Sequence, residues 1–89
     1  MSKEGVTRKI TAGLGLPKEV ALNLPLISIY GHEEINIENY KGMVEYSEEK
    51  IRLSTTIGII CIKGRKLVVK QITSESVSVK GVLTAVEFL

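Results

Sequence analysis

His32 and Cys61 are the only histidine and cysteine of this chain, and they are the side chains best suited to acid–base or nucleophilic chemistry. A metal centre needs several ligands at suitable spacing, and a cysteine nucleophile needs a base beside it. His32 stands next to Glu33 and Glu34 in an expected turn, where a lone histidine is typical of the surface. Cys61 lies in the most apolar run, which favours a buried, inert thiol. We therefore expect no catalytic residue, no cofactor and no metal, and we expect that the protein is not an enzyme.

A group of basic residues in the C-terminal half raises the question of nucleic-acid binding. The group consists of Lys63, Arg65, Lys66 and Lys70. Proteins that hold single strands usually stack the bases on aromatic side chains, and this segment has none before Phe88. Attraction to phosphate alone would be strongly salt-dependent, so nucleic-acid binding is disfavoured. Anionic lipid headgroups require no aromatic residue, so contact with a membrane surface stays an alternative to a simple solvated hairpin.

Length and composition predict one small domain. A chain of 89 residues, of which 44% are hydrophobic, can bury a single core, and the scarcity of aromatic residues makes that core aliphatic. The longest apolar run, Ile59–Ile62, is far shorter than the ~20 residues that span a bilayer, and no secretory signal is recognisable. We expect a cytoplasmic protein, with peripheral membrane attachment left open.

The net charge of +2 hides a split along the chain. Residues 26–50 carry two lysines and six glutamates, whereas residues 51–89 carry six lysines or arginines and two glutamates. The simpler interpretation is that acidic and basic strands lie side by side and form cross-strand charge pairs. The alternative is one acidic and one basic face, which would favour self-association or an acidic partner.

The N-terminal part carries the only helical patterns. Apolar residues spaced for a helix, followed by Gly13 and Gly15, predict a helical arm over residues 1–15. Pro17 suits the first turn of a short helix, and Pro25 forces the chain to extend. We therefore divide the chain into an arm (1–15) and a single β-domain with a short leading helix (16–89).

After Pro25 the sequence reads as strands separated by turn residues. Apolar alternation marks eight short runs, at 26–30, 34–38, 43–46, 51–55, 59–62, 66–72, 76–80 and 82–88. Their even spacing predicts a mainly β protein, a small antiparallel β-sandwich or barrel of about eight short strands with one or two short N-terminal helices. The triplets that end on Gly31, Gly64 and Gly81 are typical of hairpin turns. They also leave open a short β-solenoid-like stack, in which a repeated unit would pack on its neighbours.

The order of several short motifs resembles a known family. The motifs are Leu16–Val20, Leu24-Pro25, Ile29–Gly31, Ile37–Gly42, Tyr46-Ser47, Ile51–Leu53, Gly58 and Ile62–Gly64. Their succession resembles the YabP/YqfC family of small sporulation proteins from endospore-forming Firmicutes, and it is closer to the YqfC branch. The resemblance extends from about Leu14 to Phe88. The chain departs from the family pattern at Leu26, where Arg is common, and at Tyr40-Lys41, where His-Arg is frequent.

The resemblance implies a protein of the mother cell that is needed for spore development and has no known catalytic activity. Members of this family are associated with a membrane protein encoded beside them, which is a YqfD-like protein for YqfC-like members. The implied function is that of a small adaptor or structural protein, acting at the forespore membrane or spore envelope through protein–protein contacts. The alternatives are self-association and the binding of anionic lipid or nucleic acid by the basic C-terminal hairpin. Tyr40–Gly42 is expected to form a turn. The candidate partner-contact residues are the exposed turn residues Asn39, Tyr40 and Lys41 and the basic residues Arg52, Arg65 and Lys66.

Overall fold

The computed structural model describes residues 23–89. The predicted helical arm and the predicted short leading helix fall on residues 1–22 and lie outside the described residues. Within residues 23–89 no helix is long and apolar enough to cross a membrane.

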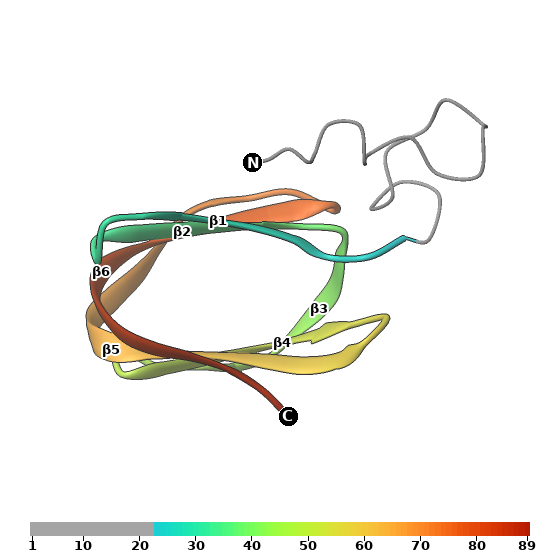
Figure 1. Cartoon of the computed structure of the whole chain (residues 1–89). Coiled ribbons are helices and arrows are strands. Elements are labelled where there is room, and N and C mark those ends of the chain that lie inside the picture. Colours follow the sequence, from blue (N-terminus) through green and yellow to red (C-terminus); the bar gives the residue numbers. More distant parts are fainter. Residues whose placement is uncertain (1–22) are drawn as a thin grey trace, which may run out of the picture.

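The described chain forms six strands in one antiparallel sheet (Figure 1). The sheet order is β1-β2-β6-β5-β4-β3, so the sheet is open, with β1 and β3 at its two ends. In chain order the strands are β1 (Leu26–Tyr30), β2 (Glu34–Glu38), β3 (Tyr40–Tyr46), β4 (Lys50–Thr55), β5 (Gly58–Ile72) and β6 (Ser76–Phe88).

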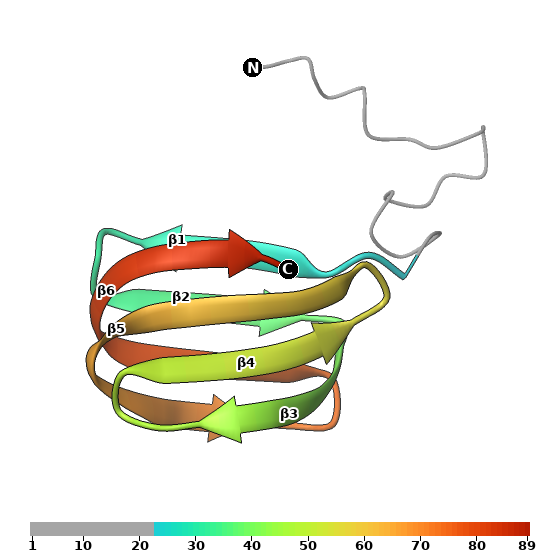
Figure 2. The ribbon, with the colours of Figure 1, turned by 90° about the horizontal axis from the view of Figure 1, so that it is seen from below.

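Strands β5 and β6 are much longer than the others, with 15 and 13 residues, and both bend near their middle. Each of them therefore takes part in two layers that face each other (Figure 2). The first half of β5 pairs with β4 and the first half of β6 pairs with β2. One layer thus holds β1, β2, the second half of β5 and the first half of β6. The other layer holds β3, β4, the first half of β5 and the second half of β6. The sheet is a sandwich made by folding one sheet over on itself.

Two glycines allow the backbones of β5 and β6 to approach closely at the bend, which we define as Gly64–Leu67 of β5 with Gly81 of β6. A Cβ atom on Gly64 would overlap the carbonyl oxygen of Val82. Gly81 has a φ of +145°, and a Cβ atom there would lie 2.7 Å from the carbonyl oxygen of Lys66. Only glycine fits at such positions without displacing the partner backbone. The register also shifts here, because β5 contributes one more residue than β6 between the pairs Arg65–Val82 and Val68–Lys80.

Turns from both layers supply hydrogen bonds to backbone N–H groups at the bend. From one layer, Glu49 and Glu48 accept from the N–H groups of Gly64 (3.0 Å) and Leu67 (2.8 Å) through their carbonyl oxygens. From the other layer, the carbonyl oxygen of Glu33 accepts from Gly81 at 3.1 Å. A bulged strand loses regular ladder partners, so these turns replace hydrogen bonds that the bend removes.

The core lies between the two layers and is aliphatic, as the composition predicts. Strands β2, β4, β5 and β6 contribute alternate residues to it, which is the period of a strand with one buried face. The fully buried cluster consists of Ile35, Ile37, Ile51, Leu53, Ile60, Ile62, Leu67, Val77 and Val79. Burial of one such side chain contributes about 2 kcal/mol to stability, so this cluster is the main force that holds the layers together.

The prediction of a mainly β, antiparallel fold is confirmed, and the prediction of about eight strands is wrong. The runs 59–62 and 66–72 are one strand, β5, and the runs 76–80 and 82–88 are one strand, β6. Gly64 and Gly81 were expected to make turns, but they stand inside bent strands. Tyr40–Gly42, expected as a turn, opens strand β3, and only Asn39 (φ 66°) turns the chain there. The paired register of one folded sheet also differs from a solenoid-like stack.

Two ion pairs join the acidic segment, residues 26–50, to the basic segment, residues 51–89. Arg52 lies 3.4 Å from Glu45, its cross-strand partner on the neighbouring strand β3. Lys70 Nζ lies 3.3 Å from a carboxylate oxygen of Glu34, across the intervening strand β6. The simpler interpretation of the charge pattern therefore holds for Arg52 and Glu45, whereas Lys63 pairs at 3.2 Å with Glu87 within the basic segment. Such exposed pairs each contribute at most about 1 kcal/mol, so they affect register and solubility more than stability.

The close approach at the bend predicts an unequal response to two Gly→Ala substitutions. Gly64→Ala should lower the free energy of unfolding by about 2–4 kcal/mol, because its methyl group meets a backbone oxygen that cannot move away. Gly42→Ala is the matched control within β3, since the nearest atom to its Cβ would be Ser54 Oγ at 3.7 Å, an ordinary contact. Urea denaturation measures both. Equal stabilities for the two variants would show that the bend does not depend on close backbone contact.

Candidate protein-interaction surface

Asn39 and Tyr40 connect parts of the fold to one another. The Asn39 side-chain amide donates to the carbonyl oxygen of Leu24 at 2.8 Å, and its backbone N–H donates to Glu75 at 2.7 Å. The Tyr40 hydroxyl donates to the carbonyl oxygen of Thr73 at 2.6 Å, and its ring packs against the core. Both residues are half-buried. Their positions indicate a structural role for these two partner-contact candidates.

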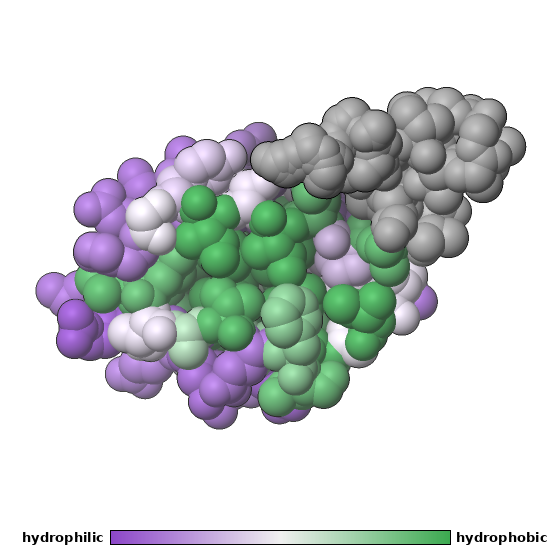
Figure 3. Space-filling view, viewed as in Figure 1, coloured by the Kyte–Doolittle hydropathy of each residue, from purple (hydrophilic) through white to green (hydrophobic). Residues whose placement is uncertain are grey.

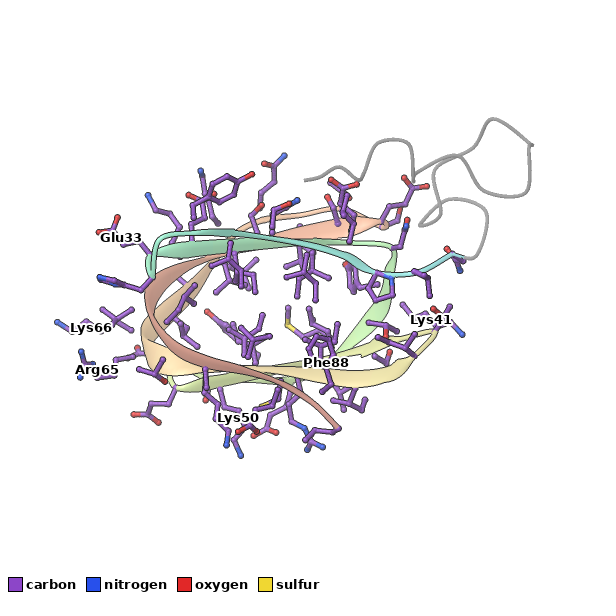
Figure 4. The ribbon with its side chains drawn as sticks, in the orientation of Figure 1. Glu33, Lys41, Lys50, Arg65, Lys66 and Phe88 are labelled. Carbon is purple, nitrogen blue, oxygen red and sulfur yellow. The ribbon has the colours of Figure 1, made fainter. Side chains whose placement is uncertain are left out.

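The exposed basic candidates lie at opposite ends of the molecule (Figure 4). Lys41 is exposed near the start of β3. Arg65 and Lys66 are exposed at the bend, with Glu33 also at that end. The structure therefore brings Arg65 and Lys66 together, and it separates them from Lys41. The six candidates of the sequence analysis do not form one surface.

Arg52 covers a cysteine on the outer face of the sheet. Arg52 and Glu87 are the cross-strand partners of Cys61 on either side, and residues directly opposite in a ladder share a face. Cys61 is only 2% exposed, which confirms the predicted burial, but it does not belong to the core cluster between the layers. The Arg52 guanidinium lies 3.4 Å from Glu45, and its Nε atom is buried with no hydrogen-bond partner among the described residues. Arg52 is thus held against the sheet and is a poor candidate for a free contact.

No group of three or more His, Cys, Asp or Glu side chains within residues 23–89 is arranged to hold a metal ion. His32 is exposed in the turn between β1 and β2. Its carbonyl oxygen accepts a hydrogen bond from the backbone N–H of Leu83 at 2.7 Å, so its backbone helps to fix the bend.

One long side of the folded sheet leaves apolar residues uncovered. We define the open side as the side along which β1 and residues Val82–Phe88 of β6 run in opposite layers, each with one edge unpaired among the described strands. Both views of the ribbon place these two segments on the same side (Figures 1 and 2). The space-filling view shows apolar residues gathered there, between the two layers (Figure 3).

Two residues of the open side point toward the core and are nevertheless exposed. Ile29 is opposite the buried Ile35, so it shares the inner face, yet it is 51% exposed. Phe88 is opposite the buried Ile60 and is 64% exposed. Their neighbours on this side are only partly buried against the core; these are Ile27, Leu83 and Val86. Contiguous exposed apolar surface of this kind is typical of an interaction site.

Sequence reasoning missed Ile29 and Phe88 as candidate contacts. Their alternation with polar residues correctly indicates the inner face of a strand. Whether an inner face is covered depends on the opposite layer, which is set by the bend and not by the local pattern. One signal was available in the composition of β1, which has no charged residue. Exposed edge strands usually carry charges, so an uncharged edge strand indicates a contact.

The cover over Cys61 predicts slow modification of its thiol. A thiol reagent should label Cys61 in the native chain at least about tenfold more slowly than in urea, because an inaccessible sulfur reacts only after local opening. Arg52→Ala should increase the native labelling rate, whereas Lys41→Ala, which changes an exposed residue at one end of the molecule, should leave it unchanged. Labelling can be followed by intact mass. Fast labelling of the unchanged protein would contradict the outer-face burial.

Two comparisons with known proteins relate the chain to others. The model of the YabP family matches residues 24–89, which spans all six strands. The chain is 32% identical over 80 residues to the uncharacterized protein YqfC of Bacillus subtilis (strain 168), and this match covers 90% of the chain and 86% of YqfC. The family match includes the bend and the open side. The chain therefore belongs to the YabP family.

Proposed function

We propose that this protein is a non-enzymatic adaptor or structural protein of sporulation, which acts through protein–protein contacts. Membership of the YabP family supports the link to sporulation. The finer parts of the proposal are that the protein works in the mother cell, at the forespore membrane or spore envelope, and that it engages a YqfD-like membrane protein.

The open side is the observation that carries the contact function. It combines unpaired strand edges with exposed apolar side chains such as Ile29 and Phe88. An unpaired edge offers backbone donors and acceptors to an added segment, while alternate side-chain contacts give specificity. In a domain this small, an apolar strip left uncovered lowers solubility unless another molecule covers it. A protein partner fits both features, because it can supply backbone hydrogen bonds and apolar side chains together.

The contact function predicts that one charge on the open side impairs sporulation. Phe88→Lys should reduce crosslinking to the membrane partner in sporulating cells, and the yield of mature spores, by about tenfold or more, because a lysine would be desolvated in an apolar contact. Val44→Lys is the matched control, since Val44 is 56% exposed but lies on β3, at the other end of the sheet order. Crosslinking followed by purification reports partner and self-contacts together. Normal spore formation with Phe88→Lys, with no partner recovered by the unchanged protein, would refute the adaptor function.

A second candidate function is the binding of an anionic surface, lipid or nucleic acid, at the bend. The observation that favours it is the pair Arg65 and Lys66, which are adjacent and exposed at one end of the molecule. Neither takes part in an ion pair among the described residues. Clustered cations of this kind are attracted to anionic headgroups by about 1 kcal/mol each. The glutamates at the same end, Glu33 with Glu48 and Glu49, work against this attraction.

The second function predicts salt-dependent binding to vesicles that contain phosphatidylserine. The double variant Arg65→Glu/Lys66→Glu should abolish sedimentation with such vesicles at low salt, and Lys41→Glu should not, because Lys41 lies at the far end of the molecule. A parallel assay with a single-stranded oligonucleotide separates lipid from nucleic acid. If the unchanged protein binds neither at low salt, this candidate is removed.

A further inference from the structure

We propose that strand β1 is a self-pairing edge, through which two copies of this protein join in an antiparallel, two-fold symmetric dimer. This inference rests on the proposed contact function and names the occupant of one edge of the open side, strand β1. In the dimer, β1 of one copy pairs with β1 of the other, and the sheet continues across the two molecules.

Strand β1 differs from every other free edge of the described sheet. The edge of β3 carries Lys41 and Glu45, and its register with β4 shifts twice. The free half of β6 carries Glu87, and the free half of β5 carries Lys70; their mutual ladder also contains register shifts. Charges and bulges are the usual means by which edges are kept from pairing. These three edges are protected in that way.

Strand β1 has neither of these protections. Its sequence, Leu-Ile-Ser-Ile-Tyr, contains no charge and no proline, and its pairing with β2 is regular over all five residues. Leu26, Ile29 and Tyr30 are exposed, with 37%, 51% and 59% of their surface accessible. An unprotected, regular and apolar edge is a template for strand addition.

The five residues of β1 are self-complementary when the strand is reversed about Ser28. Antiparallel pairing centred there puts Ser28 opposite Ser28 of the second copy. On the inner face, Ile27 meets Ile29 in both directions. On the outer face, Leu26 meets Tyr30 in both directions. Aliphatic, aromatic and Ser–Ser pairs of this kind each favour an antiparallel ladder by about 0.2–1 kcal/mol. Any other register would leave some of these side chains without a partner.

The entry of the chain into β1 is fixed, which lowers the entropic cost of pairing. The side chain of Thr56 donates a hydrogen bond to the carbonyl oxygen of Asn23 at 2.8 Å, and Asn39 donates to that of Leu24. The two acceptor residues, Asn23 and Leu24, stand just before β1 in the sequence. On its other edge, β1 is held by β2 over its whole length. A strand that is already ordered loses little freedom on binding.

A second copy also fits the apolar strip behind β1. Ile29 lies on the inner face next to this edge, and in the dimer it gains Ile27 of the second copy as a neighbour. An isologous contact uses the same patch twice, so one unprotected edge among the described strands of each chain closes the assembly at two copies. A five-residue ladder is a small interface, so we expect a dissociation constant in about the micromolar range.

Disulfide trapping tests the register directly. In a Cys61→Ala background, the full-length Ser28→Cys variant should form a disulfide-linked dimer under mild oxidation, because opposed residues of an antiparallel ladder lie within reach of a disulfide. The control is Ser78→Cys in the same background. Ser28, Asn36 and Ser78 form one row across three strands of the same face, and Ser78 stands two strands further in. We expect the first variant to link and the second to stay monomeric.

A charge exchange at the same position supplies an independent test. Ser28→Lys and Ser28→Glu should each be monomeric by analytical ultracentrifugation at concentrations where the unchanged protein dimerises, because like charges would be opposed. An equimolar mixture of the two variants should dimerise again, since Lys and Glu would then face each other. Far-ultraviolet circular dichroism confirms that each variant keeps its sheet.

Self-pairing of β1 is refuted if the unchanged protein stays monomeric and Ser28→Cys gives no disulfide-linked dimer. It is also refuted if a dimer forms that neither Ser28→Lys nor Ser28→Glu disrupts, because another surface would then be responsible. If residues 1–22 of the same chain cover the β1 edge instead, the Ser28→Cys variant stays monomeric and forms no disulfide-linked dimer, which also contradicts self-pairing. These results concern the purified protein, so they leave the cellular test with Phe88→Lys to decide the adaptor function separately.

Discussion

The close contact between the backbones of β5 and β6 at the bend is the constraint on which the rest of the structure depends. The carbonyl oxygens of Val82 and Lys66 occupy the space where side chains at Gly64 and Gly81 would begin. With glycine at these positions, two long strands can fold over without separating, and one sheet then supplies both layers of a sandwich. The turns that carry Glu33, Glu48 and Glu49 complete the hydrogen bonding of the bent segment.

The bend also explains why the molecule has an open side. Folding one six-stranded sheet in half leaves two edges in each layer, and no further strand of the described chain is available to close them. The core cluster is covered, but the inner-face residues at the margin, Ile29 and Phe88, are not. The feature that makes a core from so short a chain therefore also creates the surface that we assign to protein contacts.

The basic residues are arranged differently from this apolar surface. Lys70 forms an ion pair with Glu34 across the intervening strand β6, and Arg52 forms one with Glu45 on the neighbouring strand β3, so part of the charge split along the chain is neutralised locally. Arg65 and Lys66 are the exception, because the bend projects them at one end of the molecule. The apolar open side and this basic end are thus distinct surfaces, and they can be tested by separate substitutions.

Much of the fold could be predicted from the sequence, and most of the site could not. Alternation in Glu34–Glu38 and Ile51–Thr55 correctly indicated strands and their buried faces, because that pattern is local. The strand count was wrong because Gly64 and Gly81 resemble turn glycines until the atoms opposite them are known. Asn39 and Tyr40 were expected to be exposed, but hydrogen bonds to distant residues, Leu24 and Thr73, hold them half-buried. Exposure of Ile29 depends on a layer that the bend places, and no local pattern encodes it.

The central claim is that the open side, and β1 in particular, is where this protein makes its contacts. Hydrogen–deuterium exchange of the full-length chain, measured at low and at high protein concentration, tests it most directly, because amides on an unpaired edge exchange through solvent unless a second strand covers them. Our account predicts that the amides of Leu26–Tyr30 become more protected as concentration rises, while those of the β3 edge do not change. Exchange in Leu26–Tyr30 that is independent of concentration, or protection that rises at β3 instead, would contradict it.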